Sequence, residues 1–151
     1  MMKIESIAIS KKKGTRKVQI EEASLIQDFG LEGDAHAGNW HRQVSLLPSE
    51  SIDGVRAIIL DIADGAFAEN LITVGLDLGS ASVGDRLLLA SGAELEVTQI
   101  GKECHHGCVI RQKTGDCIMP REGVFCRVLR GGEVRPGTNL ELKRSAPSRR
   151  L

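Results

Sequence analysis

Apolar residues along this chain come in short runs separated by glycine-containing turns, a pattern that predicts strands more than helices. Ile7 and Ile9 alternate with polar neighbours, and so do Val18 and Ile20. Residues 13–15 lie between these two runs and have the composition of a hairpin turn. The chain is therefore expected to open with two strands joined by a tight turn.

The best helix candidate begins at Ser49, which has the side chain of an N-cap residue and follows Pro48. Apolar residues then recur at helical spacing at Ile52, Val55, Ile58 and Ile59. We expect this helix to end by about Ala63.

Further short strands are predicted between turn signals, over residues 43–47, 67–74, 87–89, 95–99, 124–129 and 134–142. The last two are expected to form a closing hairpin around Gly131 and Gly132. Many short strands with one or two short helices predict a mainly β fold, a closed or partly open β-barrel. We expect the barrel to span residues 1–142 and residues 143–151 to form a flexible basic tail.

Composition narrows the class of protein. A chain of 151 residues fits one domain, and 20 basic against 20 acidic residues give a net charge of zero, which does not favour nucleic acid as a partner. The aromatic content is 3%. No apolar run approaches the ~18 residues of a membrane span. We therefore expect a cytoplasmic protein without a membrane or nucleic-acid partner, in which the four cysteines are not paired as disulfides.

Two of those cysteines lie in a short cluster that must carry chemistry. The run Lys102, Glu103, Cys104, His105, His106, Gly107, Cys108 holds two thiols and two imidazoles within seven residues. A thiolate can act as metal ligand, nucleophile or sulfur carrier, and an adjacent imidazole can lower its pKa. The cluster follows a predicted strand, where catalytic and binding groups are often held.

Zinc is one candidate ligand for this cluster, with Cys104, His106, Cys108 and Cys117 as the possible donor set. The spacing does not favour it, because structural zinc sites usually add a second ligand pair farther along the chain. Two adjacent histidines also rarely turn onto the same ion.

Cations gather around the cluster although the whole chain is neutral. They outnumber the acidic residues of the same stretch and comprise Lys102, Arg111, Lys113, Arg121, Arg127 and Arg130. A local positive field would stabilise a thiolate and bind a phosphate or another oxyanion through charge-assisted hydrogen bonds.

Other candidate residues have simpler interpretations. Cys126 lies in an apolar run and is expected to be a buried hydrophobe. His36 follows Asp34 in a glycine-rich loop over residues 30–38, and Asp34 is expected to orient it.

Several motifs in order along the chain resemble the MOSC domain, named after the C-terminal domain of molybdenum cofactor sulfurases. They are residues 33–36 (Gly-Asp-Ala-His), 43–47, 67–71 (Phe-Ala-Glu-Asn-Leu), 83–85 (Val-Gly-Asp), 97–99 leading to the cysteines, and 119–125. The resemblance covers residues 1–142. It implies a barrel like the β-barrel domain of pyruvate kinase.

The resemblance also implies a cofactor and a role for the thiol. In relatives that reduce N-hydroxylated compounds a cysteine ligates the molybdenum of a pterin cofactor, and a sulfur-carrier role is proposed for the sulfurases and for many small members. Pyridoxal phosphate binding is a further term associated with the family. A thiolate suits both roles, because it can ligate molybdenum and can hold sulfane sulfur as a persulfide.

Residue by residue, the family cysteine falls on Cys104 or on Cys108, depending on the alignment. Asn70 matches an asparagine that contacts the pterin, Ala68 stands where the reductases have arginine, and Ser51 occupies the place of a cofactor-contacting hydroxyl residue. The expected contacts with the molybdopterin cofactor are completed by Lys102, His105, His106, Arg111 and Arg121.

The prediction is thus a protein that binds molybdenum cofactor or carries sulfur, with Cys104 or Cys108 as the reactive or metal-binding thiol. A cysteine desulfurase or a molybdoenzyme is the expected protein partner, because the sulfur would arrive from another protein. The alternative is a non-catalytic module that binds zinc or a partner through the Cys/His cluster.

Overall fold

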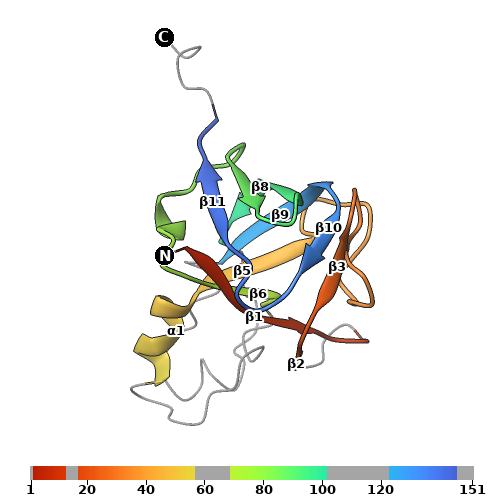
Figure 1. Cartoon of the computed structure of the whole chain (residues 1–151), viewed down its shortest axis with the longest axis horizontal. Helices are drawn as coiled ribbons and strands as arrows, with labels where there is room; N and C mark the ends of the chain where they lie inside the picture. The colour runs from red at the N-terminus through yellow and green to blue at the C-terminus, as the bar shows by residue number, and fades with distance from the viewer. Residues whose placement is uncertain (1, 13–16, 57–68, 102–122, 146–151) are drawn as a thin grey trace.

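The computed structural model describes residues 2–12, 17–56, 69–101 and 123–145, and side chains of residues 54–56 are not among those described. Within these ranges the chain is mainly β, with one short α-helix (Figure 1). An eight-stranded sheet has the order β11-β7-β8-β9-β5-β6-β1-β2. Its strands are β1 (Lys3–Ile9), β2 (Val18–Ile20), β5 (Val44–Pro48), β6 (Leu71–Val74), β7 (Arg86–Leu89), β8 (Glu94–Ile100), β9 (Val124–Arg130) and β11 (Leu140–Lys143).

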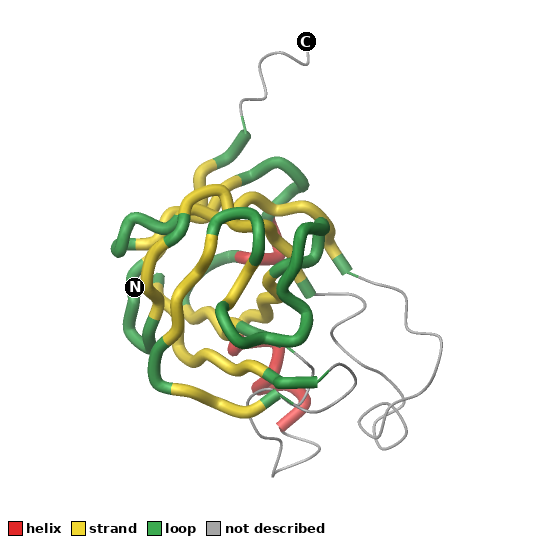
Figure 2. Tube along the Cα trace, turned by 90° about the vertical axis from the view of Figure 1, so that its right-hand side faces the viewer, coloured by secondary structure: helices red, strands yellow, loops and turns green. Residues whose placement is uncertain are grey.

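A second, three-stranded sheet has the order β10-β3-β4 and contains β3 (Ala23–Ile26), β4 (Gly30–Leu31) and β10 (Gly132–Val134). The helix α1 (Ser49–Arg56) follows β5 directly, and a short 3-10 helix, η1 (Leu78–Ser80), follows β6. In Figure 2 the strands curve around a common interior and α1 lies below them.

The large sheet curls until its first and last regions meet. Lys3 at the start of β1 forms an antiparallel bridge with Asn139, just before β11. The Ile4 amide donates to the Thr138 carbonyl at 2.8 Å, and the Leu140 amide donates to the Met2 carbonyl at 3.2 Å. The fold is therefore a partly open β-barrel, and the predicted fold class is confirmed.

The barrel interior is filled by alternate residues of the strands. Val44 and Leu46 of β5, for example, are buried and belong to one cluster. In β1 a register shift between Ile4 and Ser6 brings Ile4 and Ile7, three residues apart, into the same cluster. Side chains of successive strand residues point to opposite faces, so the residues between them face away from this core. Burying a side chain such as Leu46 contributes about 1.5–3 kcal/mol.

Most predicted strands are present, because alternation and turn residues are local signals. β1 pairs antiparallel with β2, as the opening hairpin predicts, and β5, β6, β7, β8 and β9 lie at the predicted places. Ser49 begins the helix as predicted. The predicted extension of the helix to Ala63 and the hairpin turn at residues 13–15 lie outside the described residues.

The predicted closing hairpin between residues 124–129 and 134–142 is wrong. β10 pairs with β3, and β11 pairs with β7, so neither pairs with β9. Gly131 explains the turn toward β3, because a Cβ atom there would lie 2.7 Å from the Leu25 carbonyl oxygen. The chain therefore passes from the large sheet to the three-stranded sheet at Gly131, where the backbone lies so close to β3 that only glycine fits.

The expected boundary between barrel and tail falls within β11. Lys143 pairs with Arg86, the Ser145 amide donates to Asp85 Oδ1 at 2.9 Å, and Arg144 Nη2 donates to Ser80 Oγ at 2.8 Å. Residues 146–151 lie outside the described residues.

Asp85 joins this last strand to the turn before β7. Its carboxylate accepts hydrogen bonds from the backbone amides of Ser82 and Ser145, both at 2.9 Å, and lies 3.6 Å from Arg144. Burial alone would raise the pKa of the Asp85 carboxyl, but these donors and the arginine outweigh it and lower the pKa below its ordinary value. Asp85 therefore stabilises the fold in its ionised form.

Replacing Asp85 with asparagine should lower the free energy of unfolding by about 1–2 kcal/mol at pH 7. Because the folded pKa is lowered, the carboxylate's contribution is complete above the unfolded pKa and is lost as pH falls through the folded pKa. The difference between the wild type and Asp85→Asn should therefore shrink below about pH 4. Urea unfolding between pH 7 and pH 2.5 measures it, with Glu5→Gln, at an exposed position of β1, as control. A difference that stays constant over that range would contradict the assignment.

Among the described residues, none of the helices has the length and apolar character needed to cross a membrane.

Candidate functional site

Seven of the predicted site residues lie between positions 102 and 122 and therefore outside the described residues. They are Lys102, Cys104, His105, His106, Cys108, Arg111 and Arg121. Asn70 and Ser51 are described. The roles of all nine residues stay predictions, but the structure shows the surface from which the cysteine-bearing segment starts.

That segment begins and ends at one point of the large sheet. β8 ends at Ile100, which agrees with the expectation that the cysteines follow a strand, and β9 begins at Val124. The Gly101 amide donates to the Gly123 carbonyl at 2.6 Å, so the two ends of the segment are held together. We call the segment of residues 102–122 the cysteine segment.

A row of side chains crosses the sheet beside that point, on the face opposite the core. Ser45 of β5 lies opposite Phe125 of β9, which lies opposite Gln99 of β8. Asn70, just before β6, continues the row, because its amide donates to the Ser45 carbonyl at 2.9 Å. Directly opposed residues point to the same face of a sheet. We call these four residues the cross-strand row, which spans roughly 15 Å at ~4.8 Å per strand.

Asn70 is held in this row by its own side chain. Its Oδ1 accepts from the Ser45 amide at 3.0 Å and from Ser45 Oγ at 3.2 Å, and its Nδ2 donates to the Ala8 carbonyl at 3.0 Å. The residue is 1% exposed. It therefore ties β5 and β1 together at the start of β6, and any contact with a cofactor would be an additional role.

Arg42 lies over the row. Its guanidinium carbon is 4.9 Å from the centroid of the Trp40 ring and 5.5 Å from that of Phe125, within cation–π distance of both. Arg42 Nε is buried without a hydrogen-bond partner in the described structure. A buried donor without a partner is costly, so Arg42 Nε calls for an acceptor that the described residues do not supply. A cavity of about 390 Å³ is lined by the neighbouring residues Trp40 and His41, by Arg127 and by the carboxylates of Asp28 and Glu96, among others.

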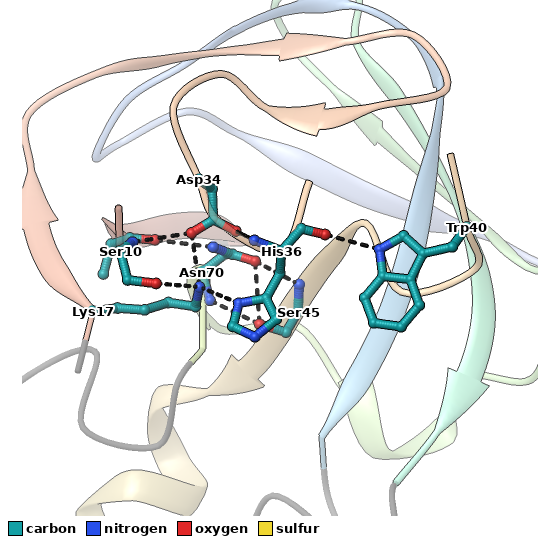
Figure 3. Close-up of polar contacts among 8 residues, drawn as sticks. Ser10, Lys17, Asp34, His36, Trp40, Ser45 and Asn70 are labelled. Atoms are coloured by element: carbon teal, nitrogen blue, oxygen red, sulfur yellow. Dashed lines mark hydrogen bonds and ion pairs between the residues drawn. The ribbon is translucent and has the colours of Figure 1, made fainter. Parts of the chain in front are cut away.

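A buried ion pair supports the loop before Arg42. Lys17 Nζ lies 2.7 Å from Asp34 Oδ1, and the two side chains are 1% and 0% exposed. Asp34 also accepts hydrogen bonds from the backbone amides of Ser10, at 3.0 Å, and His36, at 3.3 Å. Figure 3 shows these groups converging beside Ser45.

The His36 ring is oriented by Lys17 rather than directly by Asp34. Lys17 Nζ lies 3.0 Å from His36 Nδ1, and because an ammonium can only donate, Nδ1 must be the acceptor. The His36 carbonyl in turn accepts from Trp40 Nε1 at 2.8 Å. Asp34 was expected to orient His36, and its carboxylate does bind the His36 backbone amide. The contact with the His36 ring comes from Lys17.

Ser51 lines a cavity of about 600 Å³ together with Ile100 and Val124, the residues at the ends of β8 and β9. The described part of the lining also holds the carboxylates of Glu50 and Asp77 but no cation. This lining does not favour an anionic group.

Cys126 is in the core, as the apolar run predicts. It is 0% exposed, and burial, followed by the nearby charge of Glu96, raises the pKa of its thiol far above the ordinary value. A thiol that stays protonated is a poor nucleophile and a poor metal ligand. Cys126 does not compete with the cysteines of the segment for their chemistry.

No group of three or more His, Cys, Asp or Glu side chains that could hold a metal ion occurs in the described ranges. The proposed zinc donors Cys104, His106, Cys108 and Cys117 all lie in the cysteine segment, outside those ranges.

Sequence reasoning missed Lys17 and Arg42. Lys17 ends a run of basic residues that resembles a solvated turn, and Arg42 follows Trp40 and His41 in a polar stretch. The available signal was position, because Arg42 directly precedes the predicted buried strand over residues 43–47, where a charged side chain is unusual.

Three solved structures share the fold. The YuaD protein from Bacillus subtilis has a TM-score of 0.80 at 23% identity, covering 97% of this chain and 98% of its own. YiiM from Geobacillus stearothermophilus has a TM-score of 0.69 at 23% identity, covering 94% and 75%. YiiM from Escherichia coli has a TM-score of 0.65 at 23% identity, covering 97% and 71%. No curated protein matches the chain in sequence.

The fold and the site thus define a partly open β-barrel protein with a row of mostly polar side chains across the four central strands of its large sheet. The family model of the MOSC domain matches residues 33–141, and the chain belongs to the MOSC domain family. This family is associated with molybdenum cofactor sulfurases.

Proposed function

We propose that this protein binds molybdenum cofactor and handles it with a thiol of Cys104 or Cys108, which either carries sulfur as a persulfide or ligates the molybdenum. The observation that carries the proposal is Arg42, whose guanidinium lies within cation–π distance of two aromatic rings and whose buried Nε has no hydrogen-bond partner among the described residues. The pterin cofactor carries a phosphate, which is an acceptor of the kind that a guanidinium binds.

The physical fit rests on the fork of the guanidinium. A guanidinium binds phosphate through parallel, charge-assisted hydrogen bonds, and the Trp40 and Phe125 rings hold its plane in one orientation. Phe125 belongs to the cross-strand row, and Gln99 is at one end of this row. Two residues separate Gln99 from the cysteine segment. A cofactor anchored at Arg42 would therefore have its remaining atoms within reach of that segment.

The chain's own residues would share the work. Asn70, Ser51, Lys102, His105, His106, Arg111 and Arg121 are the proposed further contacts. When bound, the cofactor supplies a metal centre that accepts thiolate or sulfide ligands. A free thiol is maintained in the cytoplasm, where we place this activity. A cysteine desulfurase would supply the sulfur, or a molybdoenzyme would receive it.

Arg42→Ala should reduce the retention of molybdenum cofactor about 10- to 100-fold, which corresponds to the loss of a charged hydrogen bond worth about 1.5–3 kcal/mol. The protein is incubated with the cofactor and desalted, and the pterin is then quantified by fluorescence after oxidation and the molybdenum by elemental analysis. Arg86→Ala is the matched control, because Arg86 lies in β7, lines neither cavity and forms an exposed ion pair with Glu94 at 2.8 Å. Equal retention by Arg42→Ala and Arg86→Ala would overturn the role of Arg42.

Cys104→Ser and Cys108→Ser test the thiol in the same assay. The proposal requires that at least one of them loses retention or, in the persulfide case, loses a sulfur adduct in the intact mass. If both single variants and the double variant behave as the wild type, the proposed function fails. Stoichiometric zinc without pterin in the isolated protein would favour the zinc-binding module instead.

A further inference from the structure

His36 lies between the buried ion pair and Trp40 and is held at three points. Its backbone amide donates to Asp34 Oδ2 at 3.3 Å, and its ring Nδ1 accepts from Lys17 Nζ at 3.0 Å. Its carbonyl accepts from Trp40 Nε1 at 2.8 Å. The first two contacts come from the ion pair, and the third leads to the indole (Figure 3). His36 therefore joins a buried pair of charges to an aromatic ring at the surface.

The Lys17 ammonium fixes the His36 ring in one orientation. It has three N–H groups and, among the described residues, three acceptors: Asp34 Oδ1 at 2.7 Å, His36 Nδ1 at 3.0 Å and Ser10 Oγ at 3.3 Å. Because an ammonium can only donate, His36 Nδ1 carries no proton, and the ring cannot turn over without losing this bond. A lost bond would leave a donor of a fully buried cation unpaired, which is costly.

The backbone after His36 turns so that the Trp40 indole returns to it. The Gly38 amide donates to the Phe29 carbonyl at 2.7 Å, and the Trp40 amide donates to the Gly38 carbonyl at 2.9 Å. An indole N–H is a donor only, so the direction of the His36 carbonyl restricts the orientation of the indole ring. The His41 ring contacts the indole in an edge arrangement, with the ring centroids 5.6 Å apart.

The orientation of the indole matters for Arg42. The Arg42 guanidinium carbon lies 4.9 Å from the centroid of the Trp40 ring, and a cation is attracted to the face of such a ring. The edge of an aromatic ring carries positive character, so a rotated indole would no longer hold the guanidinium. The direction of the Arg42 donors therefore depends on the position of Trp40.

We propose that His36 is a positioning residue for Arg42: it transmits the fixed geometry of the Lys17–Asp34 pair to Trp40, which holds the guanidinium in the orientation that receives an anion. The inference rests on the proposed function, in which Arg42 binds a phosphate. It gives the ion pair a role besides stability, because a buried pair is often no more stabilising than apolar residues of similar volume. This role requires no contact between His36 and the ligand.

The test compares His36→Leu with His36→Asn. The asparagine side-chain oxygen can accept from Lys17 as Nδ1 does, whereas leucine has no acceptor. The first measurement is near-ultraviolet circular dichroism, which reports on fixed packing around aromatic side chains. Trp40 is the single tryptophan of a chain without tyrosine, so the tryptophan band comes from this residue alone. The second measurement is the Kd of inorganic phosphate, by titration calorimetry of protein without cofactor.

His36→Leu should lose most of the Trp40 band and bind phosphate about tenfold more weakly, because a guanidinium that is not preorganised must be ordered on binding. His36→Asn should keep the band and a Kd within about twofold of the wild type. Leu89→Ala is the control for lost stability, because Leu89 is a core residue of β7, which β8 and β9 separate from β5. This control should unfold more easily and leave the band and the Kd unchanged.

Each outcome decides the role of His36 or of Arg42. If His36→Leu keeps the band and the Kd, as Leu89→Ala should, His36 is merely structural and the inference is overturned. Loss of the band in His36→Asn as well would contradict it too, because the acceptor for Lys17 would then not matter. If the wild type binds no phosphate, the proposed role of Arg42 fails, while the band still decides whether His36 positions Trp40.

Trp40→Phe keeps the question open to test if His36→Leu does not fold. It removes the donor to the His36 carbonyl and keeps an aromatic ring at an exposed position. Phosphate binding by Trp40→Phe should weaken, and a Kd equal to that of the wild type would overturn the inference.

Discussion

Replacing Asp34 with alanine should lower the free energy of unfolding by about 3–5 kcal/mol, because it leaves the buried Lys17 ammonium without its counter-charge. Among the described residues, Lys17 Nζ would keep contacts with Ser10 Oγ, at 3.3 Å, and His36 Nδ1, which are neutral acceptors. The Ser10 amide would also lose its acceptor. Urea unfolding followed by circular dichroism measures the change.

The double variant Lys17→Met/Asp34→Ala, compared with the single variants Lys17→Met and Asp34→Ala, provides the decisive test. Removing both charges at once removes the unpaired charge, so the double variant should cost clearly less than the sum of the two single variants. The exposed pair of Glu22 and Arg135, at 3.4 Å with both side chains 63% exposed, is the control. Glu22→Ala should change stability by no more than about 0.5 kcal/mol. Additive losses in the double variant would show that burial of the pair is not the cause.

Asn70→Ala should cost about 2–4 kcal/mol, since it removes the partner of three buried groups: the Ser45 amide, Ser45 Oγ and the Ala8 carbonyl. The matched control is Asn39→Ala, whose side chain makes one exposed hydrogen bond, to Asp28 Oδ2. We expect that variant to lose no more than about 1 kcal/mol. Thermal and urea unfolding measure both.

The Asn70 result also tests the residue's assignment. A variant that unfolds like the wild type but loses cofactor would show that Asn70 acts at the cofactor and not in the fold. A destabilised variant whose folded fraction still retains cofactor would show the reverse. The contacts of Asn70 with β1 and β5 favour the second result.

Local patterns predicted most of this fold from sequence. Ile7 and Ile9, and Val18 and Ile20, alternate in strands that pair as predicted, and Ser49 begins the helix. Pairing between distant strands is not encoded in alternation, and here the prediction failed. β10 has the composition of a hairpin partner for β9, but its partner is β3, and the reason, Gly131 against the Leu25 carbonyl, exists only in the folded chain.

The candidate site shows the same division between local and distant information. The clustering of Cys104 to Cys108 is visible in the printed sequence, and so is the strand that precedes it. The cross-strand row is not, because Asn70, Ser45, Phe125 and Gln99 come from four separate regions and meet only through strand register. Arg42 is distinguished only in the folded chain, where its Nε is buried with no hydrogen-bond partner among the described residues.

The seam between β1 and the residues around Asn139 has a consequence for how the barrel closes during synthesis. The Ile4 amide finds its acceptor at Thr138, so β1 needs a partner that the ribosome makes much later. Among the described strands, the partners of β1 that are made earlier are β2 and β6. Folding dominated by such distant contacts is slow, on the order of milliseconds to seconds. Arrival of the segment around Thr138, and not the growth of the core, should therefore set the moment at which the newborn barrel closes.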